Sequence, residues 1–153
     1  MKKILVVIVL LMVPAISIAK PTADSAKEVQ DYFWNGDGPL LVEYKICSEV
    51  AKEGENKNEC VTEVDPSALV KGDKVVLWMN YMVPQDTEQK VSVLVMRNNR
   101  PEKTSNINLP GSLRIRTWAT LPTDKEGSYS IQLDHEIGDN FITLKKLSYQ
   151  VSE

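Results

Sequence analysis

His135 is the only histidine of this chain, and it is the side chain best suited to general acid–base chemistry near neutral pH. It stands between the carboxylates of Asp134 and Glu136, a combination that could hold a metal ion or move a proton. Adjacent residues of a strand point to opposite faces, so these three side chains cannot converge on one site unaided. Residues 138–140, Gly-Asp-Asn, predict a turn close behind them. We therefore expect His135 to lie in a solvated turn.

Sequence motifs of the common catalytic classes are missing. Gly111-Ser112 and Gly127-Ser128 lack the flanking glycine of a nucleophile elbow and lie among predicted strands. No glycine-rich phosphate loop is present. Asp65 and Asp73 could serve a hydrolase, but nothing favours that interpretation except the abundance of carboxylates in the chain. We expect a protein that is not an enzyme and that uses no cofactor and no metal.

Arginine and tryptophan alternate along residues 111–121. Arg114, Arg116 and Trp118 therefore share one face of a predicted strand, and Trp78 of another strand could join them in a stacked cation–π ladder. A ladder that stabilises the sheet is the favoured interpretation, and truncation of Trp118 would then cost about 2–4 kcal/mol. The alternative is a recognition surface, since arginine and aromatic residues are favoured at binding hot spots.

Three consecutive aromatic residues, at positions 32–34, precede the glycine-rich turn at 35–39. On a helix they cannot all face the same way, so at least one is exposed or covered by the adjacent loop. A lid on one end of the core is favoured over a contact site for sugar, lipid or protein. The candidate binding residues are Tyr32, Trp34, Trp78, Arg114, Arg116 and Trp118.

The chain has two cysteines, Cys47 and Cys60, which allow one intramolecular pairing. Residues 48–59 between them form a polar, turn-forming stretch flanked by candidate strands. A disulfide closing this loop would stabilise the fold by about 3 kcal/mol in the chain-entropy model. A metal or redox pair is the alternative, which the single histidine and the lack of a C-x-x-C spacing disfavour.

The hydrophobic pattern predicts one short helix followed by strands. Residues 22–34 have helical spacing, with Asp24 or Ser25 as the cap and Asn35-Gly36 as the end, and one apolar stripe should pack on the domain. Alternation of apolar residues then predicts strands, of which the third is covered on both faces and ends at Pro84. A polar segment follows the fourth strand; it begins with a turn at Asn98-Asn99, and its remainder could be a loose edge strand. Residues 65–69 are predicted to form one helical turn. The predicted strands are residues 40–47, 60–64, 74–83, 90–96, 111–121, 127–133 and 141–151, and the polar segment is 97–108.

This pattern predicts an all-β fold. The favoured architecture is an antiparallel immunoglobulin-like sandwich of about seven strands with a short N-terminal helix, and a small β-barrel is the alternative.

The first nineteen residues have the features of a secretory signal peptide: Lys2-Lys3, an apolar run over 4–13, and Ser17-Ile18-Ala19 at the cleavage site. The apolar run is shorter than the roughly 20 residues of a membrane-spanning helix. We expect a signal peptide at 1–19, a helix and linker at 20–38 and a β-sandwich domain at 39–153. The location would be the periplasm or, alternatively, the exterior of the cell.

Removal of residues 1–19 leaves 16 basic and 21 acidic side chains, a net charge of about −5. Nucleic acids and anionic lipids both reward clustered lysine and arginine, so neither is an expected partner.

The stretch Arg114-Ile115-Arg116-Thr117-Trp118, followed by residues 125–131, resembles the R-T-W … G-x-[WY]-x-[IV] ending of a family of small exported bacterial domains of unknown function. The likeness extends weakly upstream through residues 32–36, Cys47 and 77–84, and Tyr129 stands where tryptophan is common. The resemblance implies an immunoglobulin-like sandwich and an exported protein. It implies no activity and no catalytic residues.

We expect an exported, non-enzymatic interaction module whose partner is an envelope protein or a small ligand. The alternative is a periplasmic protein that binds a small sugar or apolar ligand between the helix and the sandwich, and a hydrolase ranks third. A concave pocket lined by Tyr32, Trp34 and Trp78 would favour a small ligand, whereas a flat exposed patch would favour a protein partner.

Cleavage after Ala19 predicts that the mature protein begins at Lys20. Intact-mass and N-terminal peptide analysis of protein taken from the envelope fraction would show this end. Retention of residues 1–19 in that fraction would contradict the predicted processing.

Overall fold

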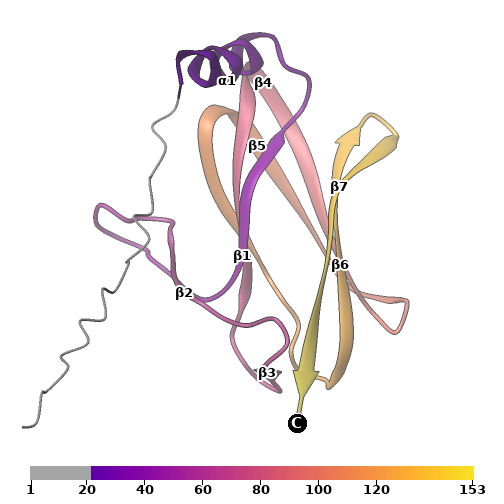
Figure 1. Ribbon diagram of the computed structural model, residues 1–153. Coiled ribbons are helices and arrows are strands. Elements are labelled where there is room, and N and C mark those ends of the chain that lie inside the picture. Colours follow the sequence, from indigo (N-terminus) through magenta and orange to yellow (C-terminus); the bar gives the residue numbers. More distant parts are fainter. Residues whose placement is uncertain (1–21) are drawn as a thin grey trace, which may run out of the picture.

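The computed structural model describes residues 22–153, which form a mostly β domain with one helix (Figure 1). The signal-peptide prediction for residues 1–19 lies outside the described residues. Within 22–153, no helix has the length and apolar character needed to cross a bilayer. The elements are α1 (Ala23–Asn35), β1 (Leu40–Val50), β2 (Cys60–Glu63), β3 (Leu69–Val70), β4 (Val76–Arg97), β5 (Arg100–Thr120), β6 (Gly127–Ile137) and β7 (Asn140–Ser152).

The strands pair in the order β2-β1-β4-β6-β7-β3, and β5 pairs with β4 outside this order. All pairs are antiparallel except β3 with β7, which is parallel. The sheet is open, because its strand order ends at β2 on one side and at β3 on the other, and these two strands are not paired with each other. The prediction of a seven-stranded all-β fold with a short N-terminal helix is therefore confirmed, and the barrel alternative is wrong.

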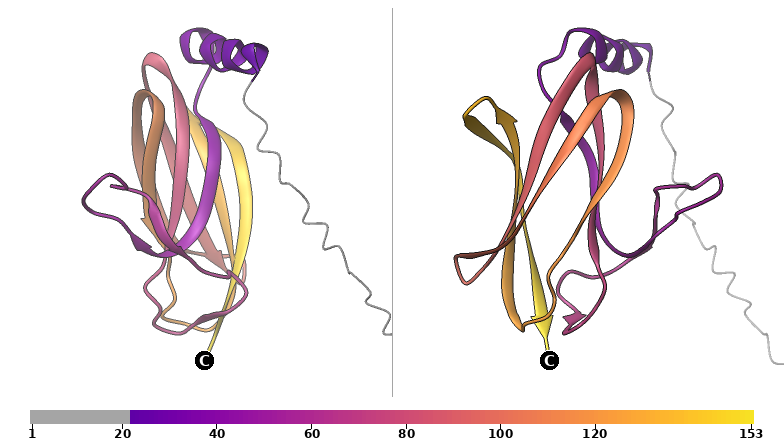
Figure 2. Two further views of the ribbon diagram at one scale, coloured as in Figure 1. Left: turned by 60° about the vertical axis from the view of Figure 1, so that its left-hand side comes forward. Right: turned by 180° about the vertical axis from the view of Figure 1, so that it is seen from behind.

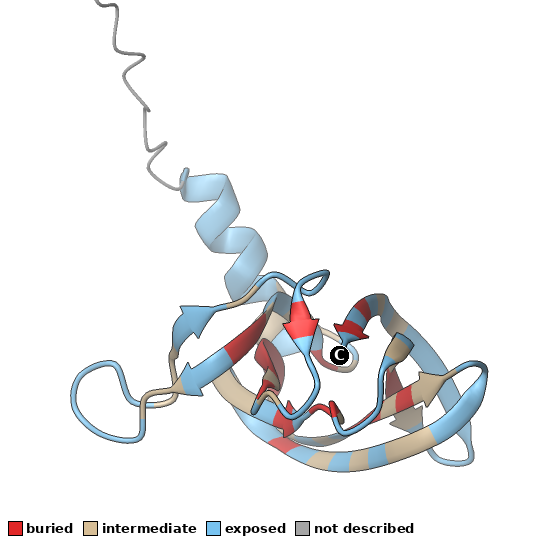
Figure 3. Cartoon of the chain, turned by 90° about the horizontal axis from the view of Figure 1, so that it is seen from below, coloured by how far each residue is buried: buried red, intermediate tan, exposed pale blue. Residues whose placement is uncertain are grey.

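Strand β4 changes partner half-way along its length. Its first half pairs with β1, and its second half, from Lys90 onward, pairs with β6. The β4–β5 hairpin thus runs through both parts of the sheet, which face each other across the core (Figures 2 and 3). Seen from below, strands of both parts carry buried residues (Figure 3).

The prediction that Pro84 ends a strand is wrong, because β4 continues through it to Arg97. Proline lacks an N–H group, but the β4–β5 ladder is interrupted between Val83 and Glu88, so no hydrogen bond is lost there. The polar segment 97–108 contains the first half of β5, a long edge strand. The turn predicted at Asn98-Asn99 is confirmed, and both residues have positive φ as in a two-residue hairpin turn.

Gly111 lies where the hairpin bends. A Cβ atom at this position would lie 2.7 Å from the carbonyl oxygen of Pro84 and 3.0 Å from the amide nitrogen of Asp86. The hydroxyl of Thr87 donates to the same Pro84 oxygen at 2.8 Å. The two strands can approach this closely only because position 111 has no side chain.

The core is built from the alternating inward residues of both parts of the sheet, including Leu77, Tyr81, Val93 and Leu133. The outward residues Trp78, Asn80 and Met82 of β4 are buried as well. This confirms the prediction that the strand is covered on both faces. The second cover comes from α1, which packs against β4, and from the loop between Val50 and Cys60.

The N-cap of the helix lies two or three residues earlier than predicted. Thr22, rather than Asp24 or Ser25, is the N-cap and accepts a hydrogen bond from the amide of Ser25 at 3.2 Å. Gly36 donates to the carbonyl of Tyr32 at the other end, as the predicted stop requires. No residue of α1 is buried, so the apolar stripe packs less closely than expected.

Residues 65–68 form a non-helical turn instead of the predicted helical turn, and Leu69 already begins β3. The carboxylate of Asp65 accepts hydrogen bonds from the amide and the hydroxyl of Ser67 at 2.8 and 2.7 Å. An aspartate that caps its own turn in this way stabilises a non-helical backbone.

Candidate functional site

A disulfide joins Cys47 of β1 to Cys60 of β2, with their Cα atoms 5.9 Å apart, which confirms the predicted pairing. It closes residues 48–59, and the middle of this segment folds back as a loop. We call residues 51–59 the disulfide loop.

The arginine and tryptophan side chains singled out in the sequence hold the disulfide loop against the sheet. The indole of Trp78 donates to the carbonyl of Asn58 at 2.7 Å. Arg114 and Arg116 both donate to one carboxylate oxygen of Glu59, at 2.8 and 2.5 Å. Arg116 also donates to the carbonyl of Lys57 at 3.1 Å. The face of β4 and β5 that carries these side chains therefore has a structural role, because it anchors the disulfide loop.

Trp78 and Trp118 lie opposite each other on β4 and β5, as the predicted ladder requires. The cation above the Trp78 ring is Lys45, at 5.7 Å from the centroid, and not an arginine. Trp118 remains 41% exposed, unlike a buried core aromatic.

Tyr32, Trp34 and Trp78, whose common pocket would have favoured a small ligand, do not come together. Trp78 is buried under the disulfide loop, whereas Trp34 is 56% exposed on α1. The hydroxyl of Tyr32 donates to the carbonyl of Gly38 at 2.6 Å and ties the helix to the start of β1. The aromatic residues of α1 thus belong to a different part of the surface from Trp78.

The prediction that His135 lies in a solvated turn is wrong. His135 is a buried residue of β6, and its Nε2 atom lies 2.8 Å from the Oε1 atom of Gln89. Its ring packs against Gly38, where an added Cβ atom would lie 2.7 Å from the ring carbon Cε1. The hairpin turn begins only after Ile137, because β6 is longer than the alternation of apolar residues suggested. Burial lowers the pKa of His135.

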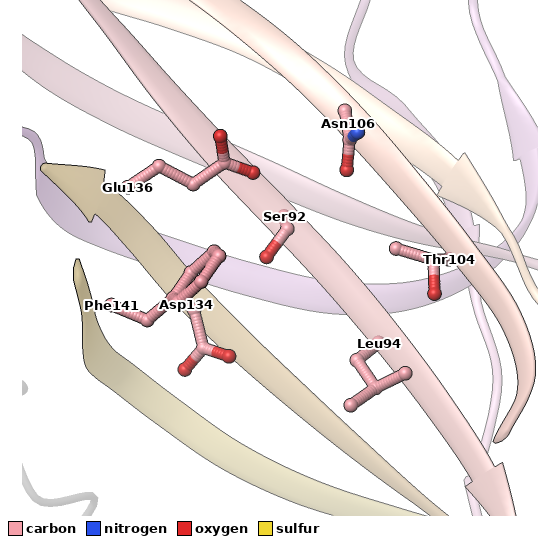
Figure 4. A pocket seen from close by; sticks show the side chains of 7 residues that line it. All are labelled: Ser92, Leu94, Thr104, Asn106, Asp134, Glu136 and Phe141. Carbon is pink, nitrogen blue, oxygen red and sulfur yellow. The ribbon is translucent and has the colours of Figure 1, made fainter. Parts of the chain in front are cut away.

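The residues on either side of His135 point the other way, to the outer face of the second part of the sheet. There they help to line a hollow of about 430 Å³, shown in Figure 4. We call it the sheet-face hollow. Its lining residues are Ser92 and Leu94 of β4, Thr104 and Asn106 of β5, Asp134 and Glu136 of β6, and Phe141 of β7.

Strand register brings these side chains together from distant parts of the chain. Ser92 lies opposite Asn106 on one side and Asp134 on the other. Phe141 lies opposite Glu136 at the end of the β6–β7 pair. The hollow therefore spans four neighbouring strands.

Hydrogen bonds fix one wall of the sheet-face hollow. The carboxylate of Asp134, only 6% exposed as a residue, accepts bonds from the amide of Gln132 at 2.8 and 3.0 Å and from the hydroxyl of Thr143 at 2.8 Å. All three bonds come from uncharged donor groups. Among residues 22–153, no salt bridge involves Asp134.

Other polar groups of the hollow are free to contact a ligand. Ser92 is 6% exposed and lines the hollow between Asn106 and Asp134. Phe141, in contrast, is 62% exposed and presents its ring at one end of the hollow. The site thus combines hydroxyl, amide and carboxylate groups with one accessible aromatic ring.

The sequence contained part of the signal for this site. Residues 90–96 alternate in the sequence, with valine at 91, 93 and 95. These valines lie in the core, which leaves Ser92 and Leu94 on the outer face. Nothing in the local pattern indicated that β5, β6 and β7 would bring their polar residues beside them, because that depends on the order of strands in the sheet. Across residues 22–153, no group of three or more histidine, cysteine, aspartate or glutamate side chains could hold a metal ion.

Comparison with known proteins supports the fold. Neither a protein-family model nor a curated protein sequence matches the chain. A solved structure described as the C-terminal domain of Wzt is similar, with a TM-score of 0.50 and 15% sequence identity over 78% of this chain and 77% of that one. At this level of identity the likeness shows a shared β-rich fold.

Trp78→Ala and Trp118→Ala should differ in their effects on stability. Loss of the buried Trp78 side chain should cost about 3–5 kcal/mol, since it leaves a cavity and removes the bond to the disulfide loop. The half-exposed Trp118 should cost about 1–2 kcal/mol, because it gives up less buried area. Urea unfolding with the disulfide intact would measure both, and equal losses would contradict the structural role assigned to Trp78.

The buried His135 should make stability depend on pH. Its folded-state pKa lies below the ordinary value of 6.5, so below about pH 6.5 the unfolded state takes up a proton that the folded state does not. The free energy of unfolding should therefore fall as the pH falls from about 7 to about 5.5, above the range in which most carboxylates titrate. His135→Gln should lose less stability over this interval, and identical pH profiles would contradict the assignment.

Proposed function

We propose that this domain binds carbohydrate through the sheet-face hollow. The observation that carries the proposal is the exposed ring of Phe141 beside hydroxyl, amide and carboxylate groups that converge on one hollow.

The chemistry of sugars matches this lining. A sugar ring has apolar C–H groups on its faces, which pack against the negative face of an aromatic ring. Its hydroxyl groups both donate and accept hydrogen bonds, and so do the hydroxyls of Ser92 and Thr104 and the amide of Asn106. A few directed polar groups with one apolar contact are typical of small-ligand sites.

We also propose that the hollow binds without catalysing hydrolysis. Asp134 and Glu136 are two residues apart on the same strand, so both meet a ligand from the same side. Glycoside hydrolases place their two carboxyl groups on either side of the bond that is cleaved. Asp134 is moreover held by Gln132 and Thr143, which suits a positioning role.

The proposed location is outside the cytoplasm, in the periplasm or beyond. The Cys47–Cys60 disulfide supports it, because disulfides persist in oxidising compartments. The signal-peptide features of residues 1–19 support it independently.

A protein partner is the second candidate. Ile137, Phe141 and Ile142 are exposed together at the β6–β7 hairpin, and clustered apolar side chains are typical of contact surfaces. If this hairpin bound a protein, Ile142 would contribute as much as Phe141.

A matched pair of variants separates the two candidates. Residues 20–153 should be retained by specific oligosaccharides on a glycan array, and Phe141→Ala should weaken retention at least tenfold, since it removes the stacking face. Ile142→Ala should bind as wild type does, because Ile142 is opposite His135 and points away from the hollow. Retention of no glycan, or equal loss in both variants, would contradict carbohydrate binding in the sheet-face hollow.

A further inference from the structure

We infer that the sheet-face hollow takes an oligosaccharide of at least two units, laid across the strands, and that it rejects an acidic sugar at the Phe141 end. This inference rests on the proposed function and specifies the class of ligand. It follows from the size of the hollow and from the unequal chemistry of its two halves.

The two halves lie on opposite sides of β4. Asp134 and Glu136 of β6 and Phe141 of β7 form one half, and Thr104 and Asn106 of β5 form the other. Figure 4 shows Phe141 and Thr104 at opposite sides, with Ser92 between them.

The span of the hollow exceeds one sugar ring. Asp134, Ser92 and Asn106 lie in one row across three neighbouring strands, which places the outer two about 10 Å apart at the backbone. A single pyranose ring is about as wide as one strand spacing. One ring stacked on Phe141 therefore leaves the β5 half free for the next unit of a chain.

The Phe141 half requires hydrogen-bond donors from its ligand. Ionised carboxylates only accept hydrogen bonds, so Asp134 and Glu136 suit hydroxyl or amine groups. Lys90 lies opposite Glu136 on β4, yet none of the salt bridges among residues 22–153 includes that carboxylate. A carboxylate or phosphate on the sugar would meet like charge here.

The β5 half has a different preference. The Asn106 amide and the Thr104 hydroxyl both donate and accept hydrogen bonds, so they suit an uncharged unit. Leu94 of β4 lies opposite Thr104 and adds an apolar wall to this half. A unit with a methyl or acetyl substituent would bury that group against Leu94.

Chain length and charge of the sugar test this inference. Residues 20–153 would be applied to an array carrying one to six units of neutral glucose, mannose and N-acetylglucosamine series, and matched series that contain glucuronic acid. Retention should rise at least tenfold from one unit to two or three in a neutral series, and the glucuronic-acid series should be retained at least tenfold less.

Variants of each half should separate the two parts of the site. Asn106→Ala should remove most of the gain between one and two units, whereas Phe141→Ala should weaken every length. Asn56→Ala, a change of an exposed amide in the disulfide loop, is the control and should leave retention unchanged.

The outcomes distinguish the inference from the function on which it rests. Equal retention of one and several units, or equal retention of neutral and acidic series, would overturn the inference and leave carbohydrate binding intact. Retention of no glycan at all would overturn the proposed function and the inference with it.

Discussion

The close approach of Gly111 to Pro84 is the constraint on which the rest of the structure depends. It lets the paired strands β4 and β5 bend together, so one hairpin serves both parts of the sheet. The inward faces of its two halves then meet as the core, with Leu77 and Tyr81 from one half and Val93 from the other. Both candidate surfaces of the molecule are outer faces of this hairpin, and their positions follow from the bend.

The two outer faces of the hairpin differ because only one of them is covered by the disulfide loop. Near the disulfide, Trp78, Arg114 and Arg116 anchor the loop, and the cross-link limits the freedom that this loop would otherwise lose on docking. The ion pairs with Glu59 are partly exposed and contribute little by themselves, so burial of the Trp78 ring is the larger stabilising contribution. The other face carries smaller polar side chains and is left open. Arginine and tryptophan, the residue types most favoured at binding sites, thus stabilise the fold. The face that carries the sheet-face hollow stays uncovered.

Patterns of neighbouring residues in the sequence predicted the strands, the disulfide and one of the turns. Alternation located the strands, the polar segment between Cys47 and Cys60 predicted the disulfide, and Asn98-Asn99 predicted its turn. The prediction failed at Pro84, because the sequence does not show that the β4–β5 ladder is interrupted there. The missing N–H group of the proline therefore costs no hydrogen bond. The prediction failed at His135 as well, since β6 continues past Leu133, where the predicted strand ends, as far as Ile137. The sheet-face hollow could not be predicted, because its lining joins four strands whose order in the sheet leaves no trace in local sequence.

His135 connects the hollow to the end of the domain. Its side chain points inward, between Gln89 and Gly38, while its neighbours Asp134 and Glu136 point outward into the hollow. Tyr32 holds Gly38 from the other side, so α1, the start of β1 and the carboxylates of β6 are joined through one buried ring. A site whose acceptors sit on a strand fixed in this way loses little freedom when a ligand binds. His135, the one candidate for acid–base catalysis in the sequence, therefore holds β6 from the inner face of the sheet, behind the two carboxylates that line the sheet-face hollow.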